Sequence, residues 1–336
     1  MKIVDAATTR DALPFGHLID ALAAMFASGC EVPLRHTHTL AVGDGSNGSG
    51  GGAGHAVGTV QIMPAWQPGR YLGIKTVGIF PGNAARGLPG LFSTYLLVDA
   101  NTGQPLAMID GDQITARRTA AASALAARYL ARLDAQRLLV VGAGRVAALL
   151  PAAYRAVRPI TEVQVWARNP AQAAALADDW RRQGLAASVA PDLAAAVAGA
   201  DVVSCATLAT APVVQGAWLQ PGSHLDLIGS FTPAMREADD ACFAGASVFV
   251  DTDEAAMKSG DLLGPMASGV LKPHHFRGTL ADLCGGRVPG RQSAAERTVF
   301  KSVGSALEDL AAAVLVVDGH RPADSPPARP TPQGRW

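Results

Sequence analysis

The turn GAGRVA, which follows the apolar run LLVV, limits the folds open to this chain more than any other segment. Because AALLPAAYRAV comes next, the sequence predicts a strand, a tight turn and a helix in that order. The pattern GxGxxA in this context is typical of a dinucleotide site: Gly142 permits the turn, Gly144 lets a pyrophosphate approach the backbone, and Ala147 lets helix and strand pack closely. Arg145 and Val146 begin the helix, whose N-terminal amides then bind the phosphate. The alternative interpretation is an ordinary strand–helix turn.

The end of the next strand indicates which dinucleotide is preferred. NAD sites usually carry an acidic residue there, which binds the ribose 2′-hydroxyl. Here VQVW ends in Ala167, Arg168 and Asn169, with no acid. A carboxylate would repel a 2′-phosphate, whereas the guanidinium of Arg168 can pair with it. We therefore predict NADP(H) as the preferred cofactor and NAD(H) as the second choice, the alternative being an arginine that faces only solvent.

The pattern of apolar runs changes along the chain. Short runs alternate with helical stretches in the second half, which indicates a parallel sheet wound with helices: RLLVVGAG, TEVQVWAR, ADVVSCAT, SHLDLIGS and ASVFVDT. Before them, VGTVQIMPAW, YLGIKTVGIF and STYLLVD indicate a meandering or mixed sheet. Helices are predicted over residues 15–29, over TARRTAAASALAARYLARL, and over the whole of TVFKSVGSALEDLAAAVLVVD. The glycine-rich residues 43–54 are predicted to be a flexible loop.

Composition excludes several classes of protein. With 49% hydrophobic and 17% charged residues, the chain is predicted to be a compact globular protein and not a disordered one. The 28 basic and 28 acidic side chains cancel, which argues against binding to nucleic acid and favours a small-molecule partner. The four cysteines form no CxxC pair, no apolar run is long enough for a membrane span, and no residues follow a metal-ligand spacing. We predict a cytoplasmic protein that binds no membrane and no metal.

Motifs along nearly the whole chain resemble those of the ornithine cyclodeaminase/mu-crystallin family. They are IMPAW, GIKTV with PGNAARGLPG, ITARRTAA, VVGAGRVA, VWARNP, GSHLDLIGSFTP with MREAD, SGDL, and GR with TVFKSVGSALEDL. The resemblance implies an α/β fold in which a Rossmann-type doubly wound parallel sheet is inserted into a mixed α+β domain. It predicts a substrate-binding domain, residues 1–125 and 303–322, that forms a homodimer, and an NADP(H)-binding domain, residues 126–302. Residues 323–336 are predicted to be a disordered tail.

The resemblance also implies a pocket for a substrate carboxylate. Its catalytic residues would be Arg35, Lys75 and Arg118, and three cations that converge on one small site suit an anion. Met63 and Phe231 are expected at the substrate pocket. Further positions are expected at the cofactor: Thr119, Arg168, Asn169, Thr207, Ser230, Ser302 and Gly304.

One departure from the family pattern bears on the reaction. Ornithine cyclodeaminases carry, after the strand that ends at Gly229, an aspartate that holds the distal amine of the substrate, and its place here falls on Phe231. An apolar ring cannot balance a buried ammonium, so a diamino acid loses its anchor. The segment GSFTP instead resembles the branch that reduces Δ1-pyrroline-2-carboxylate and Δ1-piperideine-2-carboxylate to L-proline and L-pipecolate.

The sequence therefore predicts an NAD(P)H-dependent oxidoreductase that acts on a C=N bond by hydride transfer to C2 of a cyclic imino acid. Lys75 is expected to deliver or share the imine proton if its pKa is lowered by neighbouring arginines. Alternatives within the family are an ornithine cyclodeaminase or an amino-acid dehydrogenase of the alanine type. A non-catalytic NADPH-regulated binding protein, similar to mu-crystallin, is the alternative of a different class.

Overall fold

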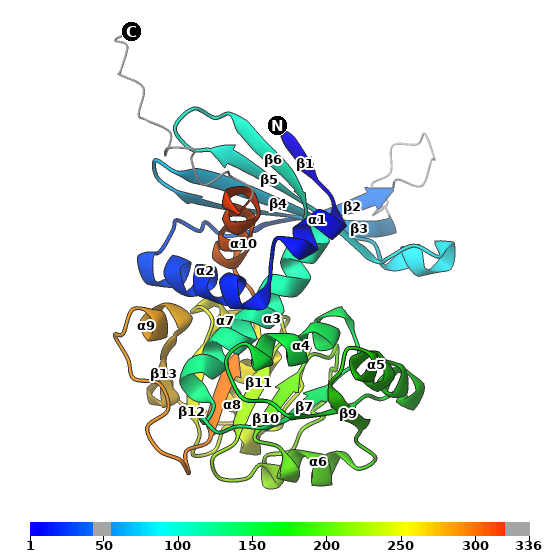
Figure 1. Cartoon of the computed structure of the whole chain (residues 1–336), viewed down its shortest axis with the longest axis vertical. Helices are drawn as coiled ribbons and strands as arrows, with labels where there is room; N and C mark the ends of the chain where they lie inside the picture. Colours follow the sequence, from blue (N-terminus) through cyan, green and yellow to red (C-terminus); the bar gives the residue numbers. More distant parts are fainter. Residues whose placement is uncertain (43–54, 320–336) are drawn as a thin grey trace, which may run out of the picture.

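The computed structural model describes residues 1–42 and 55–319. The chain is built around two β-sheets, one above the other in Figure 1, with helices between and around them. The glycine-rich loop and the C-terminal tail predicted from the sequence lie outside the described residues. The smaller, upper sheet is sheet A, and the larger, lower one is sheet B.

Sheet A has the mixed character that the sequence predicted. Its strands follow the order β1-β6-β5-β4-β3-β2, and β1 pairs parallel to β6 while the other neighbours are antiparallel. The strands are β1 (Lys2–Val4), β2 (His36–Val42), β3 (His55–Gln67), β4 (Tyr71–Ile79), β5 (Leu91–Asp99) and β6 (Pro105–Asp110).

One face of sheet A is covered by helices, among them α10 (Ala306–Asp318), which contacts β3, β4 and β5. Side chains on β4 alternate between a buried set, which includes Lys75, and a partly exposed set, which includes Leu72 and Ile74. Helix α2 (Phe15–Ser28) packs on α10 and ends at Gly29, whose φ of 76° favours glycine, as the sequence predicted. The buried face of sheet A therefore meets α10 directly.

Sheet B is an eight-stranded sheet in which all neighbouring strands run parallel. Its order is β13-β12-β14-β11-β10-β7-β8-β9, in which the chain winds first to one side of β7 and then to the other. The predicted doubly wound Rossmann-type sheet is thereby confirmed. The strands are β7 (Arg137–Val141), β8 (Glu162–Trp166), β9 (Ala186–Val189), β10 (Val202–Cys205), β11 (His224–Leu227), β12 (Ser247–Val250), β13 (Phe276–Thr279) and β14 (Thr298–Lys301).

Helix α3 (Gly111–Leu130) links the two sheets, and Figure 1 shows it running from sheet A down to sheet B. Asp110 caps its N-terminus by accepting a hydrogen bond from the Gln113 amide at 2.7 Å. The other α-helices are α1 (Ala6–Asp11), α4 (Arg145–Arg155), α5 (Pro170–Arg182), α6 (Leu193–Gly199), α7 (Glu254–Lys258), α8 (Gly260–Ala267) and α9 (Leu280–Cys284). Four short 3₁₀ helices complete the described elements: η1 (Pro81–Arg86), η2 (Gly216–Trp218), η3 (Asp240–Cys242) and η4 (Pro273–His275).

The prediction of one helix over TVFKSVGSALEDLAAAVLVVD was wrong in its first part. Residues Thr298–Lys301 form β14, which lies fully buried between β11 and β12, and the helix α10 starts only at Ala306. Threonine, valine and phenylalanine suit a buried strand as well as an apolar helix face. Gly304, with φ of 78°, separates the two elements because this backbone conformation stops a helix. The chain passes from sheet B back to sheet A across this turn.

Within residues 1–42 and 55–319, no helix is long and apolar enough to cross a membrane. The four cysteines are free thiols. The same residues contain no cluster of three or more histidine, cysteine, aspartate or glutamate side chains that could hold a metal ion.

Candidate active site

The turn after β7 has the backbone geometry that a bound pyrophosphate requires. Gly142 has φ of 120°, and a β-carbon there would lie 2.5 Å from the Ala206 carbonyl oxygen, so only glycine fits. At Gly144 a β-carbon would meet nothing within 4 Å, and no side chain caps the helix that starts next to it. The first amides of α4 thus face open space, and the residues present fit a dinucleotide phosphate.

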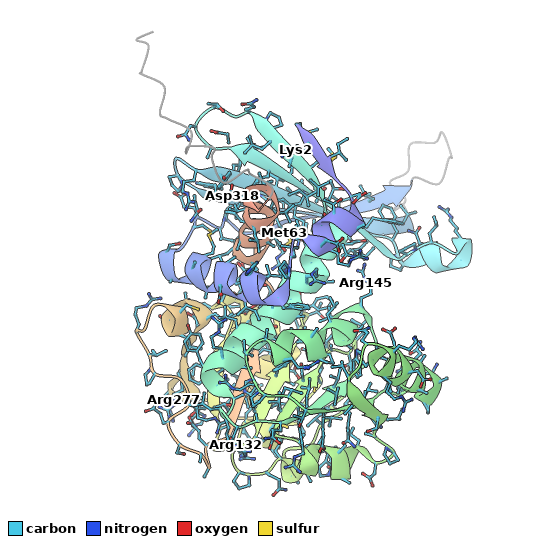
Figure 2. The ribbon with its side chains drawn as sticks, viewed as in Figure 1. Lys2, Met63, Arg132, Arg145, Arg277 and Asp318 are labelled. Atoms are coloured by element: carbon cyan, nitrogen blue, oxygen red, sulfur yellow. The ribbon has the colours of Figure 1, made fainter. Side chains whose placement is uncertain are left out.

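The remaining residues of the turn occupy three environments. Ala147 is fully buried, Val146 is partly buried, and Arg145 is exposed. The Arg145 guanidinium lies 3.5 Å from the carboxylate of Asp112, in the first turn of α3. Figure 2 shows Arg145 at the level where the lower part of the molecule meets the upper part. This contact connects the start of α4 to the helix that links the two sheets.

The end of β8 carries the two polar residues predicted to meet the adenosine ribose. Arg168 is exposed and makes no ion pair or hydrogen bond with any residue that the structure describes. Asn169 caps α5, because its side chain accepts a hydrogen bond from the Ala171 amide at 3.0 Å. The guanidinium of Arg168 is therefore free to bind an external anion.

The loops after β10 and β11 are held together by one buried carboxylate that the sequence analysis did not single out. Glu237 accepts hydrogen bonds from the amide and the hydroxyl of Thr207, at 2.7 and 2.9 Å, and from the amide of Gly229 at 2.6 Å. Burial raises the pKa of Glu237 to about 7. Its role is to fix the two loops at the carboxyl edge of sheet B, where open α/β sheets bind ligands.

Two other residues predicted near the nicotinamide, Ser230 and Ser302, follow strands β11 and β14 at this edge. Ser230 is buried and donates to the Met235 carbonyl, and the Ser302 amide donates to the Leu227 carbonyl at 3.2 Å. Thr119 lies on α3, where its hydroxyl donates to the Thr115 carbonyl at 2.7 Å.

Lys75 and Arg118 come from different elements and meet at one carboxylate on α10. The Lys75 Nζ lies 2.6 Å from Asp309 Oδ2, and the Arg118 Nε donates to Asp309 Oδ1 at 2.9 Å. A second acid, Glu308, accepts from Arg118 NH1 at 2.6 Å. Lys75 also donates to the Thr115 hydroxyl at 3.3 Å. All four charged side chains are at least nine-tenths buried.

Arg35 contacts the backbone of the turn that precedes α10. Its NH2 donates to the Gly304 carbonyl oxygen at 3.1 Å and lies 3.6 Å from the carboxylate of Glu254. The guanidinium of Arg118 also lies against that glycine, because a β-carbon there would come within 2.6 Å of NH1. The amides of Val303 and Gly304 both donate to Asp251 Oδ2 at 2.7 Å. Arg35 and Arg118 therefore meet at the turn between β14 and α10, and Lys75 joins them at the first turn of α10.

Burial and charge pairing shift the pKa values of this cluster in opposite directions. Burial lowers the pKa of Lys75 to about 8, although Asp309 acts to raise it. Burial raises the pKa of Glu308 to about 7, against the effect of Arg118. The pKa of Asp309 is lowered, because Lys75 and Arg118 together outweigh its burial. At neutral pH the cluster thus holds a charged lysine that is close to losing its proton.

A pocket of about 340 Å³ opens beside this cluster. Arg35, Met63, Glu254 and Gly304 are among the residues that line it. The volume lies at the lower end of the range for small-molecule sites. Met63 stands directly opposite Lys75 in the pairing of β3 with β4, so both side chains share the buried face of sheet A. Phe231 does not line this pocket and is 48% exposed, and its role at the substrate stays a prediction.

Comparison with known proteins assigns the family. The sequence profile of the ornithine cyclodeaminase/mu-crystallin family matches residues 53–323. The chain belongs to this family. The ornithine cyclodeaminase/mu-crystallin relatives include a Δ1-pyrroline-2-carboxylate reductase of Paracoccus denitrificans, which is 47% identical over 261 residues, 76% of this chain and 82% of that protein. The resemblance seen in the sequence is confirmed, including its closeness to the reductase branch.

Solved structures of the ornithine cyclodeaminase/mu-crystallin fold match the whole molecule. The Δ1-pyrroline-2-carboxylate reductase of Thermococcus litoralis, in complex with NADH and L-proline, superposes with a TM-score of 0.85 at 31% identity, over 95% of this chain and 97% of that one. An archaeal alanine dehydrogenase dimer with bound NAD gives 0.84 at 28% identity, over 95% of both chains. The predicted fold class is confirmed by these matches.

Proposed function

We propose that the chain is an NAD(P)H-dependent oxidoreductase that reduces the C=N bond of a cyclic imino acid. The substrates are Δ1-pyrroline-2-carboxylate, Δ1-piperideine-2-carboxylate or both, and the products are L-proline and L-pipecolate. The observation that carries the proposal is the convergence of Arg35, Lys75 and Arg118 on the Gly304 turn and the first turn of α10. A small pocket, which Arg35 and Gly304 line, lies there at the carboxyl edge of sheet B. The likeness to a reductase that binds NADH and L-proline supports it.

The substrate carboxylate would be held by the cationic cluster. Arg118 uses Nε and NH1 for its two acids, and NH2 makes no hydrogen bond within the described part of the chain. This nitrogen is therefore available to a substrate carboxylate. Arg35, which lines the pocket, supplies a second guanidinium. Holding the ring in one orientation is a large part of the catalytic task, since it replaces an encounter in solution by a fixed geometry.

Reduced nicotinamide supplies the hydride that C2 of the imine receives. The ring nitrogen must carry a proton when C2 is reduced, because the iminium is the stronger electrophile. Lys75 can hold or share this proton, because its pKa of about 8 leaves it mainly protonated at neutral pH. This pKa is also close to neutral pH, which suits a group that transfers a proton. The hydride forms a new C–H bond at C2, the electron pair of the C=N π bond moves to nitrogen, and nitrogen keeps its proton. The product is the secondary amine.

We propose NADPH as the preferred form of the cofactor. Support comes from the exposed, unpaired Arg168 at the end of β8 and from the absence of an acid there. The amide-rich turn at Gly144 serves the pyrophosphate of NADPH and NADH alike. The preference between the two cofactors therefore depends on Arg168.

We further propose that residues 1–125 with 303–322 form the substrate-binding and dimerisation domain and residues 126–302 the cofactor domain. The outer face of sheet A supports a dimer. Pro64, Ile74, Leu96 and Met108 form one row across four strands there, and all are partly or largely exposed. A second copy of the chain would cover this apolar row. Sedimentation velocity at micromolar concentration would detect the dimer.

The proposed activity is tested by mixing the purified protein with NADPH or NADH and one of three substrates. Cyclic imine alone, pyruvate with ammonia, and ornithine are followed by nicotinamide absorbance and product analysis. Rapid NADPH oxidation with the imine alone is the expected result. Turnover only of pyruvate with ammonia, or only of ornithine, would overturn the proposal in favour of the dehydrogenase or the cyclodeaminase. Tight NADPH binding with no turnover would instead indicate a binding protein.

A further inference from the structure

Asp309 is shared between the two innermost cations of the site. It lies in the first turn of α10 and is fully buried. One carboxylate oxygen accepts from Arg118 Nε at 2.9 Å, and the other lies 2.6 Å from Lys75 Nζ. These two cations come from α3 and from β4, so Asp309 fixes their relative position from a third element.

Glu308 is the neighbouring acid, but its contacts differ. It accepts from Arg118 NH1 at 2.6 Å and makes no hydrogen bond or ion pair with Lys75. The two acids together accept hydrogen bonds from Nε and NH1 of Arg118. They thereby orient the guanidinium and leave NH2 without a contact to either acid. Of the two acids, Asp309 alone contacts both cations.

The surroundings of Lys75 make its protonation depend on this contact. Its ammonium is buried, which favours the neutral amine, and Arg118 acts in the same direction. Asp309 opposes both effects, with a smaller contribution from Glu308. On the sheet, Lys75 stands between Met63 and Tyr95, and neither carries a charge at neutral pH, since burial raises the pKa of the Tyr95 phenol. Thr115 on α3 adds only a neutral hydroxyl.

We propose that Asp309 is a positioning residue. It fixes the side chains of Lys75 and Arg118 relative to each other, so that both can bind the substrate carboxylate, and it keeps Lys75 protonated during turnover. The inference rests on the proposed imine reduction for its role in catalysis. Its effect on Lys75 itself holds whatever the substrate is. Glu308, in contrast, contacts Arg118 alone and has only a smaller effect on Lys75.

The test compares Asp309→Asn with Glu308→Gln as a matched control. Removing the negative charge beside Lys75 is expected to lower the Lys75 pKa by about one to three units. The alkaline limb of kcat/KM, which reports loss of the Lys75 proton, should move to lower pH by the same amount. Glu308→Gln should raise KM for the imine and leave that limb within a few tenths of a unit. Asp309→Glu, which restores the charge, should bring the limb back toward the wild-type position.

A second measurement reads Lys75 without any turnover. Competitive labelling with acetic anhydride at a series of pH values, followed by mass spectrometry of the Lys75 peptide, gives the titration midpoint of that amine in the folded protein. Circular dichroism and NADPH binding at each pH verify that the variants are folded. An unchanged Lys75 midpoint in folded Asp309→Asn would overturn the inference. If the midpoint shifts while wild-type protein reduces no cyclic imine, the proposed function fails and the assignment of Asp309 stands.

Discussion

The guanidinium of Arg118 lies directly against the α-carbon of Gly304. A β-carbon at position 304 would come within 2.6 Å of Arg118 NH1 and 2.8 Å of NH2. The same glycine has φ of 78° and gives its carbonyl oxygen to Arg35. One residue without a side chain thus sets how closely two arginines of the site approach each other.

Gly304→Ala is expected to push Arg118 away from its position. KM for the imine should rise about ten- to a hundredfold, because this is the effect of losing about one charged hydrogen bond. Backbone strain should also lower stability by about 1–3 kcal/mol. Gly29→Ala is the control, because Gly29 has a similar φ of 76° but open space around it. Steady-state kinetics and thermal unfolding are measured for both variants. An equal KM in the two variants would contradict the role given to Gly304.

Lys75→Met should abolish turnover, with a loss of at least about a hundredfold in kcat/KM, and should leave NADPH binding intact. The reason is that Lys75 lies on β4 of sheet A and contacts Asp309, whereas the turn at Gly144 follows β7 of sheet B. Lys272→Met, at an exposed position, is the matched control. Fluorescence titration with NADPH separates binding from turnover. Near-normal turnover in Lys75→Met would rule out its assignment as catalytic.

The two glycines of the cofactor turn should respond differently to the same substitution. Gly142→Ala is expected to destabilise the fold by about 1–3 kcal/mol, because its φ is 120° and the new methyl group would meet the Ala206 carbonyl oxygen. Gly144→Ala should fold with an unchanged melting temperature, since nothing lies within 4 Å of its β-carbon position. It should bind NADPH more weakly, because the methyl group would occupy the approach of the pyrophosphate. Thermal unfolding without cofactor and calorimetric titration with NADPH check both expectations.

Arg168→Ala should reduce the preference for NADPH over NADH by about ten- to a hundredfold, the value of one charged hydrogen bond to phosphate. The kinetics with NADH should change little, because NADH has no 2′-phosphate. Arg182→Ala is the control, since Arg182 is also exposed and lies at the other end of α5. The measured quantity is the ratio of kcat/KM for the two cofactors. An unchanged ratio in Arg168→Ala would contradict the proposed cofactor preference.

His224 should make the protein sensitive to mild acid. Burial lowers its pKa to about 3, with help from Arg291 and Arg158, so the folded protein holds it neutral while the unfolded chain binds a proton below about pH 6.5. The free energy of unfolding therefore falls as the pH drops from about 6.5 toward about 3, by up to about 1.4 kcal/mol per pH unit. Urea denaturation at pH 7.5 and pH 5 should show a smaller loss for His224→Asn than for wild type. His17→Asn, at an exposed position, should follow wild type.

The sequence was sufficient to predict the strand, the turn and the helix of the proposed cofactor site. The requirements of the GAGRVA turn are local, because a strand, a tight turn and a helix follow one another within a few residues. The alternation of apolar runs predicted the parallel sheet for the same reason. Lys75 and Arg118 were found through resemblance to a family, since neither shows any local signal of its function.

Glu308 and Asp309 were not predicted as part of the site. They lie about 190 residues from Arg118 in the sequence, and no local pattern reveals an ion pair over that separation. Their position in the first turn of a helix is the only signal, and that position is common for acids because it suits the helix dipole. The strand β14 was misread because only the short turn at Gly304 separates its four residues from an apolar helix. Only its place between β11 and β12 makes it a strand.

The position of β14 also has a consequence for biosynthesis. It is translated after every other strand of sheet B, and yet it lies inside the sheet between β11 and β12. Until it is made, β12 and β13 can pair with each other but have no strand to join them to the block from β11 to β9. The nascent chain would therefore expose two unpaired inner strand edges, a condition that favours aggregation and engagement by chaperones. The final strand both closes this sheet and leads, through the turn at Gly304, into the helix that carries Glu308 and Asp309.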